Sequence, residues 1–269
     1  MSNSTFCLVL RLAGPLQSWG GRGQLNRRDT LDEPTKSGIL GLLAAAQGLR
    51  RQDSIETLLG LSLGVRTDQP GSLLRDYHTV SDYRGRPLPS AAVNAKGVQK
   101  PTSPPKYTHV TQRFYLQDAV FVAAVNGPTD LLRTLVDALR SPAFPLALGR
   151  RSCPPAQPLL LTPDETHRVD RDALWPGQPL DVLHRVPWQA SDSHRASRSH
   201  RKTMPATVDL PVTVDDDHGD DIRVDVPASF DPLHRGFNTR RVRQEWVRLA
   251  AGDPENSQPD HDPFALLGW

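Results

Sequence analysis

The sequence has few of the residues that build disulfide frameworks, zinc sites or membrane spans. Its 269 residues include two cysteines, Cys7 and Cys153, too few for a structural zinc site or a disulfide framework. Aromatic residues make up 6% of the chain, and the longest apolar run, ILGLLAAA at 39–46, is far too short to cross a bilayer. No N-terminal segment has the pattern of a secretory signal. We therefore expect a reduced, cytoplasmic protein without membrane association.

Motifs for metals and nucleotide cofactors are also missing. His184, His194 and His200 stand in a polar segment without paired ligand spacing. The acidic run at 215–221 fails as a calcium loop because Gly219 comes one position early and position twelve is not glutamate. Neither a Walker lysine motif nor a dinucleotide fingerprint occurs. We expect no metal and no cofactor.

What the chain does have is an uneven distribution of charge, hidden by a formal net charge of +2. Residues 1–115 carry 15 Lys+Arg against 8 Asp+Glu, residues 116–202 carry 11 against 9, and residues 203–269 carry 6 against 13. Clustered cations attract phosphate backbones. The first part is therefore a candidate polyanion surface, and the acidic last part is not.

Hydrophobic periodicity predicts alternating strands and helices along residues 1–165. Leu8, Leu10 and Leu12 alternate with other residues, as in a half-buried strand at 6–13. Apolar stripes predict helices at 35–49 and from residue 129. Further strands are expected at 61–67, 107–116, 118–126 and 158–162. This order is βαββαβ, so we predict an α+β, ferredoxin-like (RRM-like) domain with two helices on one face of an antiparallel sheet.

The rest of the chain is expected to form smaller parts. Residues 166–252 read as a small β-rich C-terminal region with a hairpin around the acidic turn. A mobile basic loop is expected at 193–202, SHRASRSHRK. Residues 253–269 form a polar tail that ends in PFALLGW, a short apolar segment of the kind that docks on a surface.

Two short segments predict phosphate binding. LGRRSCP at 148–154 places a glycine, which allows close approach or positive φ, beside two arginines, whose planar groups match phosphate oxygens. PTKSGILGLL at 34–43 places Lys36, Ser37 and Gly38 in the first turn of a helix, where amide N–H groups attract anions. A tight turn with solvated arginines and ordinary helix capping are the open alternatives.

A basic arm is predicted at 81–113, because this stretch is rich in Pro, Gly, Ser and Ala and has few large apolar residues. Its cations would clamp a nucleic-acid backbone. Before the arm, Tyr77 and His78, together with Trp19, offer rings for stacking on bases, although Trp19 could equally anchor a loop. Tyr77 and His78, with Lys36 or Lys106, could also supply metal-free RNA cleavage.

Five segments resemble the CasD family, the subunit of the type I-E CRISPR surveillance complex Cascade that holds the 5′ handle of the guide RNA (crRNA). They are GPLQSWG at 14–20, PTKSGILGLL at 34–43, LRDYHTV at 74–80, DYRG at 82–85 and LGRRSCP at 148–154. They occur in the family's order. Beyond residue 165 the similarity thins.

The resemblance implies a domain of the repeat-associated RNA-binding superfamily, in which a glycine-rich loop after the second helix contacts RNA. It implies that the arm at 81–113 is an inserted thumb hairpin. It also implies that the protein caps the complex between a backbone subunit and the large PAM-recognising subunit, with target DNA nearby only within the complex. A different subunit cuts precursor RNA in type I-E systems, so a non-catalytic subunit is expected.

The expected RNA-binding residues combine these segments. They are Trp19, Arg27, Lys36, Ser37, Gly38, Arg75, Tyr77, His78, Arg84, Lys96, Lys100, Lys106, His109, Arg113, Gly149, Arg150, Arg151 and Ser152. Two alternatives stay open. One is a metal-independent CRISPR repeat RNA endonuclease, because related subunits of another subtype cleave. The other is a protein scaffold without RNA contact.

Overall fold

A computed structural model describes residues 5–20, 26–82, 95, 107–163, 173–199, 207–231 and 234–251. The first elements are β1 (Phe6–Ala13), β2 (Leu16–Gln17), β3 (Trp19–Gly20), β4 (Arg27–Arg28), β5 (Thr30–Leu31), α1 (Lys36–Ala46), α2 (Glu56–Leu59), β6 (Ser62–Gln69), β7 (Ser72–Asp82), β8 (Tyr107–Gln117), β9 (Val120–Asn126) and α3 (Thr129–Arg140). The others are β10 (Leu160–Leu161), β11 (Leu174–Pro176), α4 (Pro179–Arg185), α5 (Asp192–Ser199), β12 (Thr207–Asp215), β13 (Asp221–Ser229) and β14 (Gly236–Ala250). The expected mixture of helices and strands is confirmed. Within these ranges no helix is long and apolar enough to span a membrane.

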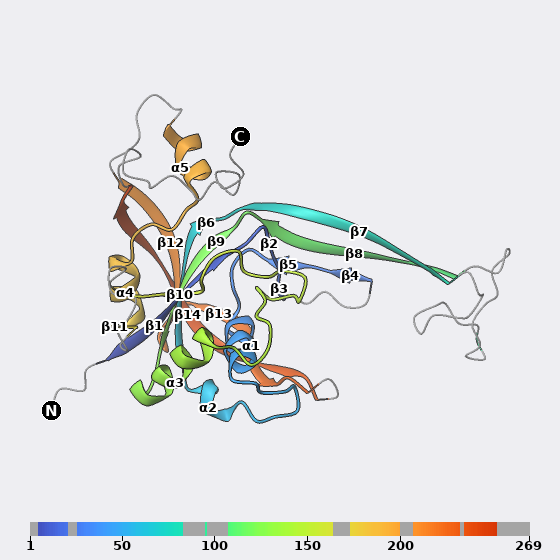
Figure 1. The fold of residues 1–269 in the computed structure, drawn as a ribbon, viewed down its shortest axis with the longest axis horizontal. Helices are drawn as coiled ribbons and strands as arrows, with labels where there is room; N and C mark the ends of the chain where they lie inside the picture. The colour runs from blue at the N-terminus through green and yellow to red at the C-terminus, as the bar shows by residue number, and fades with distance from the viewer. Residues whose placement is uncertain are drawn as a thin grey trace, which may run out of the picture.

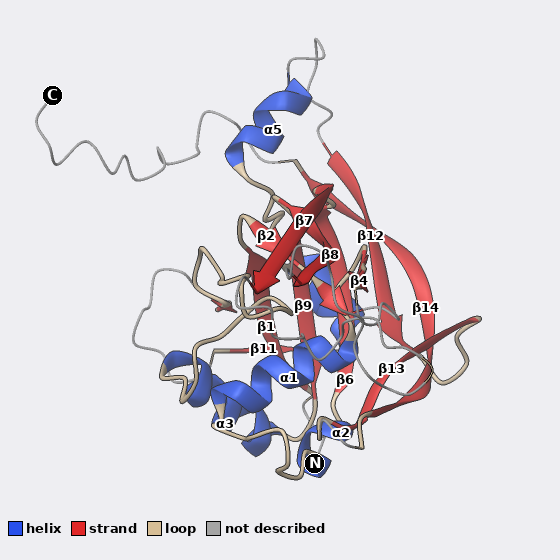
Figure 2. Cartoon of the chain, turned by 90° about the vertical axis from the view of Figure 1, so that its right-hand side faces the viewer, coloured by secondary structure: helices blue, strands red, loops and turns tan. Residues whose placement is uncertain are grey.

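One antiparallel sheet organises the molecule. Its strands follow the order β10-β1-β9-β6-β12-β14-β13, and β11 also pairs with β1. Helices α1 and α3 pack on one face, where they meet Leu8, Leu10 and Leu12 of β1 (Figure 2). Helix α4 packs on the opposite face against Cys7 and Val9. The strand predicted at 6–13 is confirmed with the same bounds, but its expected half burial is wrong, because helix α4 covers its second face.

The two long helices form where their sequences predict them. Thr35 caps α1, since its hydroxyl accepts a hydrogen bond from the Gly38 N–H at 3.1 Å. The predicted apolar stripes of both helices face the core. Their buried members are Ile39, Leu40, Leu42, Leu43 and Ala46 of α1 and Leu132, Leu135, Val136 and Leu139 of α3.

The C-terminal strands continue the same sheet. Strand β12 pairs with β6 on one side, where Thr213 lies opposite Val65, and with β14 on the other. The boundary expected at residue 165 falls between β10 and β11, and both of these strands pair with β1. The prediction of a loop at 193–202 is wrong for residues 193–199, because residues 192–199 form helix α5. The Ser191 hydroxyl accepts a hydrogen bond from the His194 N–H at this helix start.

A buried ion pair fixes α4 to the sheet. Arg66 of β6 is fully buried, and its guanidinium pairs with the equally buried Asp68 at 2.7 Å. The guanidinium also donates to the main-chain carbonyls of Leu183, Val186 and Pro187, which end α4 and follow it. These bonds satisfy carbonyls that a helix end leaves free.

Candidate nucleic-acid interface

Strands β7 and β8 form a two-stranded antiparallel ribbon that projects from the main sheet (Figure 1). Their register runs without a break from Ser72 opposite Gln117 at the base to Asp82 opposite Tyr107. At the base, β2 and β4 also pair with β8. The ribbon therefore starts earlier in the chain than the arm predicted at 81–113.

Most of the predicted cations of this arm lie outside the described residues. These are Arg84, Lys96, Lys100 and Lys106, and for His109 only the backbone, in β8, is described. They stay predictions.

One face of the ribbon presents apolar and aromatic side chains together with arginines. Side chains alternate along a strand, so Leu73, Arg75 and Tyr77 of β7 share a face with Phe114 of β8. The Tyr77 side chain is 60% exposed. The Arg27 guanidinium lies 4.9 Å from the centroid of the Phe114 ring. Exposed rings and arginines on a strand surface are typical of platforms for unpaired bases.

The other face carries His78 and Arg113. The His78 ring pairs with the carboxylate of Asp76 on the same strand. Arg28 of β4 lies beside Arg113 in the parallel register with β8. Tyr77 and His78 therefore point to opposite faces of β7.

The turn at 148–154 approaches the chain itself rather than an open space. Gly149 has φ +85°, as its predicted conformational role requires. A Cβ at this position would overlap the carbonyl oxygen of Ser18. The Ser18 N–H in turn donates to the Leu148 carbonyl at 3.1 Å. Gly149 was predicted to allow close approach of a phosphate. In the structure, the group that approaches it closely is the backbone of Ser18.

Arg150 fastens this turn to the ribbon base. Its Nη1 donates to the Phe114 carbonyl at 3.1 Å, and its Nη2 donates to the carbonyls of Arg28 at 2.7 Å and Asp29 at 3.2 Å. The guanidinium also lies 5.0 Å from the centroid of the Tyr115 ring. These contacts use most of its donors, so Arg150 has a structural role at the ribbon base.

The next two residues of the turn differ from Arg150 in their environment. Arg151 is exposed and makes no ion pair or hydrogen bond with any described side chain or backbone group. The Ser152 hydroxyl lies 3.4 Å from the Tyr115 hydroxyl of β8. The turn therefore offers one uncommitted guanidinium, that of Arg151, beside the ribbon.

These contacts define a surface that we call the ribbon-base surface. It comprises Arg27, Arg75, Tyr77 and Phe114 on one face of the ribbon, Arg28 and Arg113 on the other face, and Arg151 in the adjacent turn. The sequence singled out five of these residues. Arg28 and Phe114 were missed as binding residues. Each directly follows a predicted cation, Arg27 or Arg113, in a strand.

Trp19 does not belong to this surface. Its side chain is fully buried, and the indole N–H donates to the Gln17 side chain at 3.1 Å. The ring packs so closely on α1 that a Cβ at Gly38 would come within 2.7 Å of it. The prediction that Trp19 stacks on bases is wrong, and the alternative role as an anchor is the observed one.

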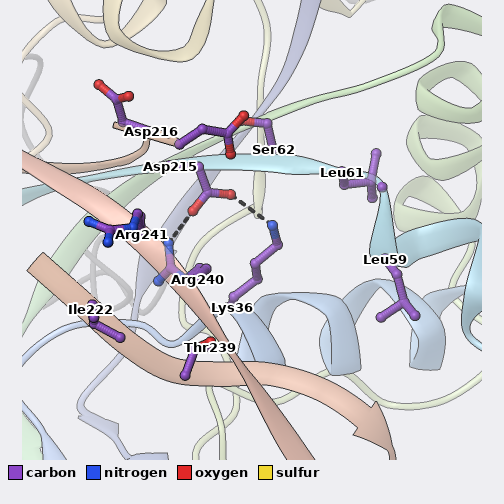
Figure 3. Close-up of a pocket in the computed structure, with 12 residues that line it drawn as sticks. Lys36, Leu59, Leu61, Ser62, Asp215, Asp216, Ile222, Thr239, Arg240 and Arg241 are labelled. Carbon is purple, nitrogen blue, oxygen red and sulfur yellow. Dashed lines mark hydrogen bonds and ion pairs between the residues drawn. The ribbon is translucent and has the colours of Figure 1, made fainter. Parts of the chain in front are cut away.

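The start of α1 is occupied by the protein's own carboxylates (Figure 3). The Lys36 ammonium is buried and pairs with Asp215 at 2.7 Å. The Lys36 N–H donates to the Asp225 carboxylate at 2.8 Å. The Gly38 N–H bonds to Thr35, so it too is engaged. The phosphate site predicted at Lys36 and Gly38 is therefore wrong, because two residues about 180 positions away supply the anions.

Ser37 and Arg240 complete the surroundings of this helix start. The Ser37 hydroxyl lies 3.3 Å from the Thr35 hydroxyl. Arg240 pairs with both Asp215 and Asp225. Burial alone would lower the pKa of Arg240, but the hydrogen bonds and charges of these carboxylates raise it above its ordinary value. The cluster is a closed set of charges that stabilise one another.

The described residues offer neither a metal centre nor an activated thiol. No group of three or more His, Cys, Asp or Glu residues in the described ranges is placed to hold a metal ion. Burial raises the pKa of Cys7 to about 12 and also raises that of Cys153. Both thiols are therefore protonated near neutral pH.

Comparisons with known proteins agree with this architecture. Residues 7–243 match the family described as CRISPR-associated protein (Cas_Cas5). The chain is 38% identical over 172 residues to the CRISPR system Cascade subunit CasD of Escherichia coli strain K12, covering 57% of this chain and 69% of that protein.

Two solved structures are similar over nearly the whole chain. A chain of a CRISPR RNA-guided surveillance complex has a TM-score of 0.69 and 35% identity, with 91% of each chain covered. A structure described as a Cas protein has a TM-score of 0.61 and 31% identity, with 90% of this chain and 94% of that chain covered. The resemblance of the five sequence segments is confirmed, and the chain belongs to the Cas5 family of CRISPR-associated proteins.

Proposed function

We propose that this protein is a non-catalytic subunit of a type I-E CRISPR surveillance complex, in which it binds and caps the 5′ handle of the guide RNA. The observation that carries the proposal is the ribbon-base surface, which distributes five arginines, an exposed tyrosine and a phenylalanine over the two faces of one ribbon and the adjacent turn. The names of its relatives, a Cascade subunit and an RNA-guided complex, support the same conclusion.

The fold assignment forms part of this proposal. The strand order β10-β1-β9-β6, with α1 after β1 and α3 after β9, supports a ferredoxin-like domain. We assign the β7–β8 ribbon as the base of the predicted thumb hairpin. The base pairs with β2 and β4, so the main body holds the ribbon in place.

Each part of the surface has a distinct task in this mechanism. The guanidiniums of Arg75, Arg113 and Arg151 neutralise phosphates, which makes binding sensitive to salt. Tyr77 stacks on an unpaired base of the handle, as rings on strands do in RNA-binding domains. A capping subunit must also contact its neighbours, here a backbone subunit and the large PAM-recognising subunit, with target DNA nearby only inside the assembly.

Arg151→Glu tests the RNA-binding step without disturbing the fold. Because the Arg151 side chain has no partner among the described residues, the free energy of unfolding should stay unchanged. The dissociation constant for a repeat-derived RNA with an intact 5′ handle should rise about tenfold, and the slope of log K against log salt should fall by about 1. Filter binding at several salt concentrations measures both.

Arg51→Glu is the matched control, because Arg51 is an exposed arginine in the segment between α1 and α2, which Figure 1 shows apart from the β7–β8 ribbon. It should bind the RNA as the wild type does. Equal affinities for wild type and Arg151→Glu, or equal losses in both variants, would remove the ribbon-base surface as the RNA site.

The non-catalytic part of the proposal has its own test. Tyr77 and His78 lie on opposite faces of β7, so one substrate hydroxyl cannot reach both from the same side. Purified protein incubated with repeat RNA in EDTA should leave the RNA intact, as read on a denaturing gel. A product that forms with the wild type and disappears in His78→Ala would establish the endonuclease instead.

A further inference from the structure

The outer face of the β13–β14 hairpin carries exposed aliphatic side chains far along the sheet from the ribbon. Ile222 and Val224 are 59% and 51% exposed, and they lie opposite Arg241 and Thr239 in the register with β14. Arg223, between them, points to the inner face and pairs there with Glu33 at 3.0 Å. We call Ile222, Val224, Thr239 and Arg241 the outer hairpin face.

A cavity of about 670 Å³ opens on this face beside Ile222 (Figure 3). Leu59 and Leu61, which lead into β6, line its other wall. The buried charges at its floor, those of Lys36 and Arg240, are already paired with carboxylates. Most of the remaining lining is polar or charged, so the aliphatic part of the cavity is limited to Leu59, Leu61 and Ile222.

The rim of the cavity is acidic. Asp216 pairs with Arg243 at 3.2 Å, but Asp217 and Asp220 have no cationic partner among the described residues. Asp221 lies two positions before Arg223, so its side chain points to the inner face, where it accepts a hydrogen bond from the Gln244 amide. Near Asp217 and Asp220, one described arginine has no carboxylate partner among the described residues: Arg241, whose Nη1 donates to the Gly219 carbonyl. The rim thus has an excess of negative charge.

We propose that the outer hairpin face docks a segment of another protein subunit that presents an apolar side chain flanked by lysine or arginine. The apolar side chain would pack on the exposed Ile222 and Val224, and the cations would meet Asp217, which lines the cavity, and Asp220. The excess of carboxylates repels a phosphate backbone, so this face excludes RNA. The inference rests on the proposed function only in taking the partner from the same complex.

Site-specific crosslinking in the assembled complex tests the docking surface. Val224→Cys, labelled with a benzophenone maleimide, is incorporated into the complex on its guide RNA and irradiated. The native Cys7 and Cys153 are both buried, so the label should react with the new thiol alone, and unmodified wild type carried through the procedure checks this. We expect an adduct with a protein subunit at a peptide that contains lysine or arginine.

Trp246→Cys is the matched control, because Trp246 is an exposed residue of β14 that lies opposite Pro211 of β12 and points to the other face of the sheet. An adduct of Val224→Cys with RNA, no protein adduct at all, or a protein adduct with the same partner and yield as that of Trp246→Cys would overturn the proposal.

A second variant reports on affinity. Ile222→Glu combined with Val224→Glu should raise the apparent dissociation constant of this subunit for the rest of the complex about tenfold or more, while its affinity for isolated guide RNA stays unchanged. Unchanged assembly of the double variant would count against docking. Filter binding of the wild type separates the two proposals, since failure there removes the RNA function and leaves the docking result standing.

Discussion

Replacing Asp68 by alanine should lower the free energy of unfolding by about 3–5 kcal/mol, because it leaves the charge of Arg66 buried without a counter-ion. Both side chains are fully shielded from solvent. The Asp68 carboxylate also accepts a hydrogen bond from the Gln189 N–H at 2.6 Å, and its main-chain carbonyl accepts from the Trp188 indole at 2.9 Å. Alanine therefore removes the Gln189 hydrogen bond as well as the ion pair, while the main-chain bond to Trp188 remains possible.

The chain contains a matched control for burial. Arg248 donates two hydrogen bonds to Asp209, at 2.7 and 3.0 Å, through Nε and Nη2. Arg66 binds Asp68 through the same two nitrogen atoms. These side chains are 71% and 50% exposed, so water solvates either partner when the other is removed. Asp209→Ala should leave the urea midpoint unchanged within error. Chemical denaturation of the two variants, followed by circular dichroism, compares them, and similar midpoints would show that burial does not decide the strength of this pair.

Much of the fold could be predicted from local sequence because its main signals are local. The apolar stripes of α1 and α3 and the cap at Thr35 come from residues within one or two turns of each other. The strands at 107–116 and 118–126 are rich in β-branched and aromatic residues. What periodicity could not supply is the layer on the second face of the sheet, since α4 comes about 170 residues after β1.

In the candidate site, too, local sequence predicted some residues correctly, whereas contacts between distant parts of the chain decided the others. Arg75, Tyr77 and Arg113 are found together because antiparallel pairing of β7 with β8 brings them to one ribbon. Trp19 and Lys36 were misassigned because charge and ring type do not reveal burial. The partner of Lys36, Asp215, lies in the acidic part of the chain that composition set apart from the basic part.

The arginines of the turn at 148–154 show why a cation count overstates a binding surface. Arg150 and Arg151 are adjacent and identical in type, yet Arg150 donates to three carbonyls at the ribbon base and Arg151 donates to no described group. Likewise Arg66 is buried and pairs with Asp68, so it cannot contact a phosphate. Only three-dimensional contacts separate the arginines that hold the fold from those that can meet phosphate.

Gly149→Ala should destabilise the protein by about 2–4 kcal/mol and weaken RNA binding at the same time. Its φ of +85° is strained for a residue with a side chain, and the added methyl group would overlap the Ser18 carbonyl. Relief of that overlap must move either residue 18 or the turn that carries Arg150 and Arg151. Because Arg150 ties the turn to the Phe114 carbonyl, the displacement reaches the ribbon base.

Gly60→Ala is the control for the loss of a glycine as such. Gly60 has φ −75°, and an added Cβ meets nothing within 4 Å, so alanine should be neutral there or stabilising by about 0.4–1 kcal/mol. Urea denaturation gives the stability of both variants, and filter binding at a temperature where both are folded gives RNA affinity. Equal stability and equal RNA affinity of Gly149→Ala and Gly60→Ala would contradict this prediction. The turn at 148–154 could then move without loss, and its contact with Ser18 would not position Arg151 beside the ribbon.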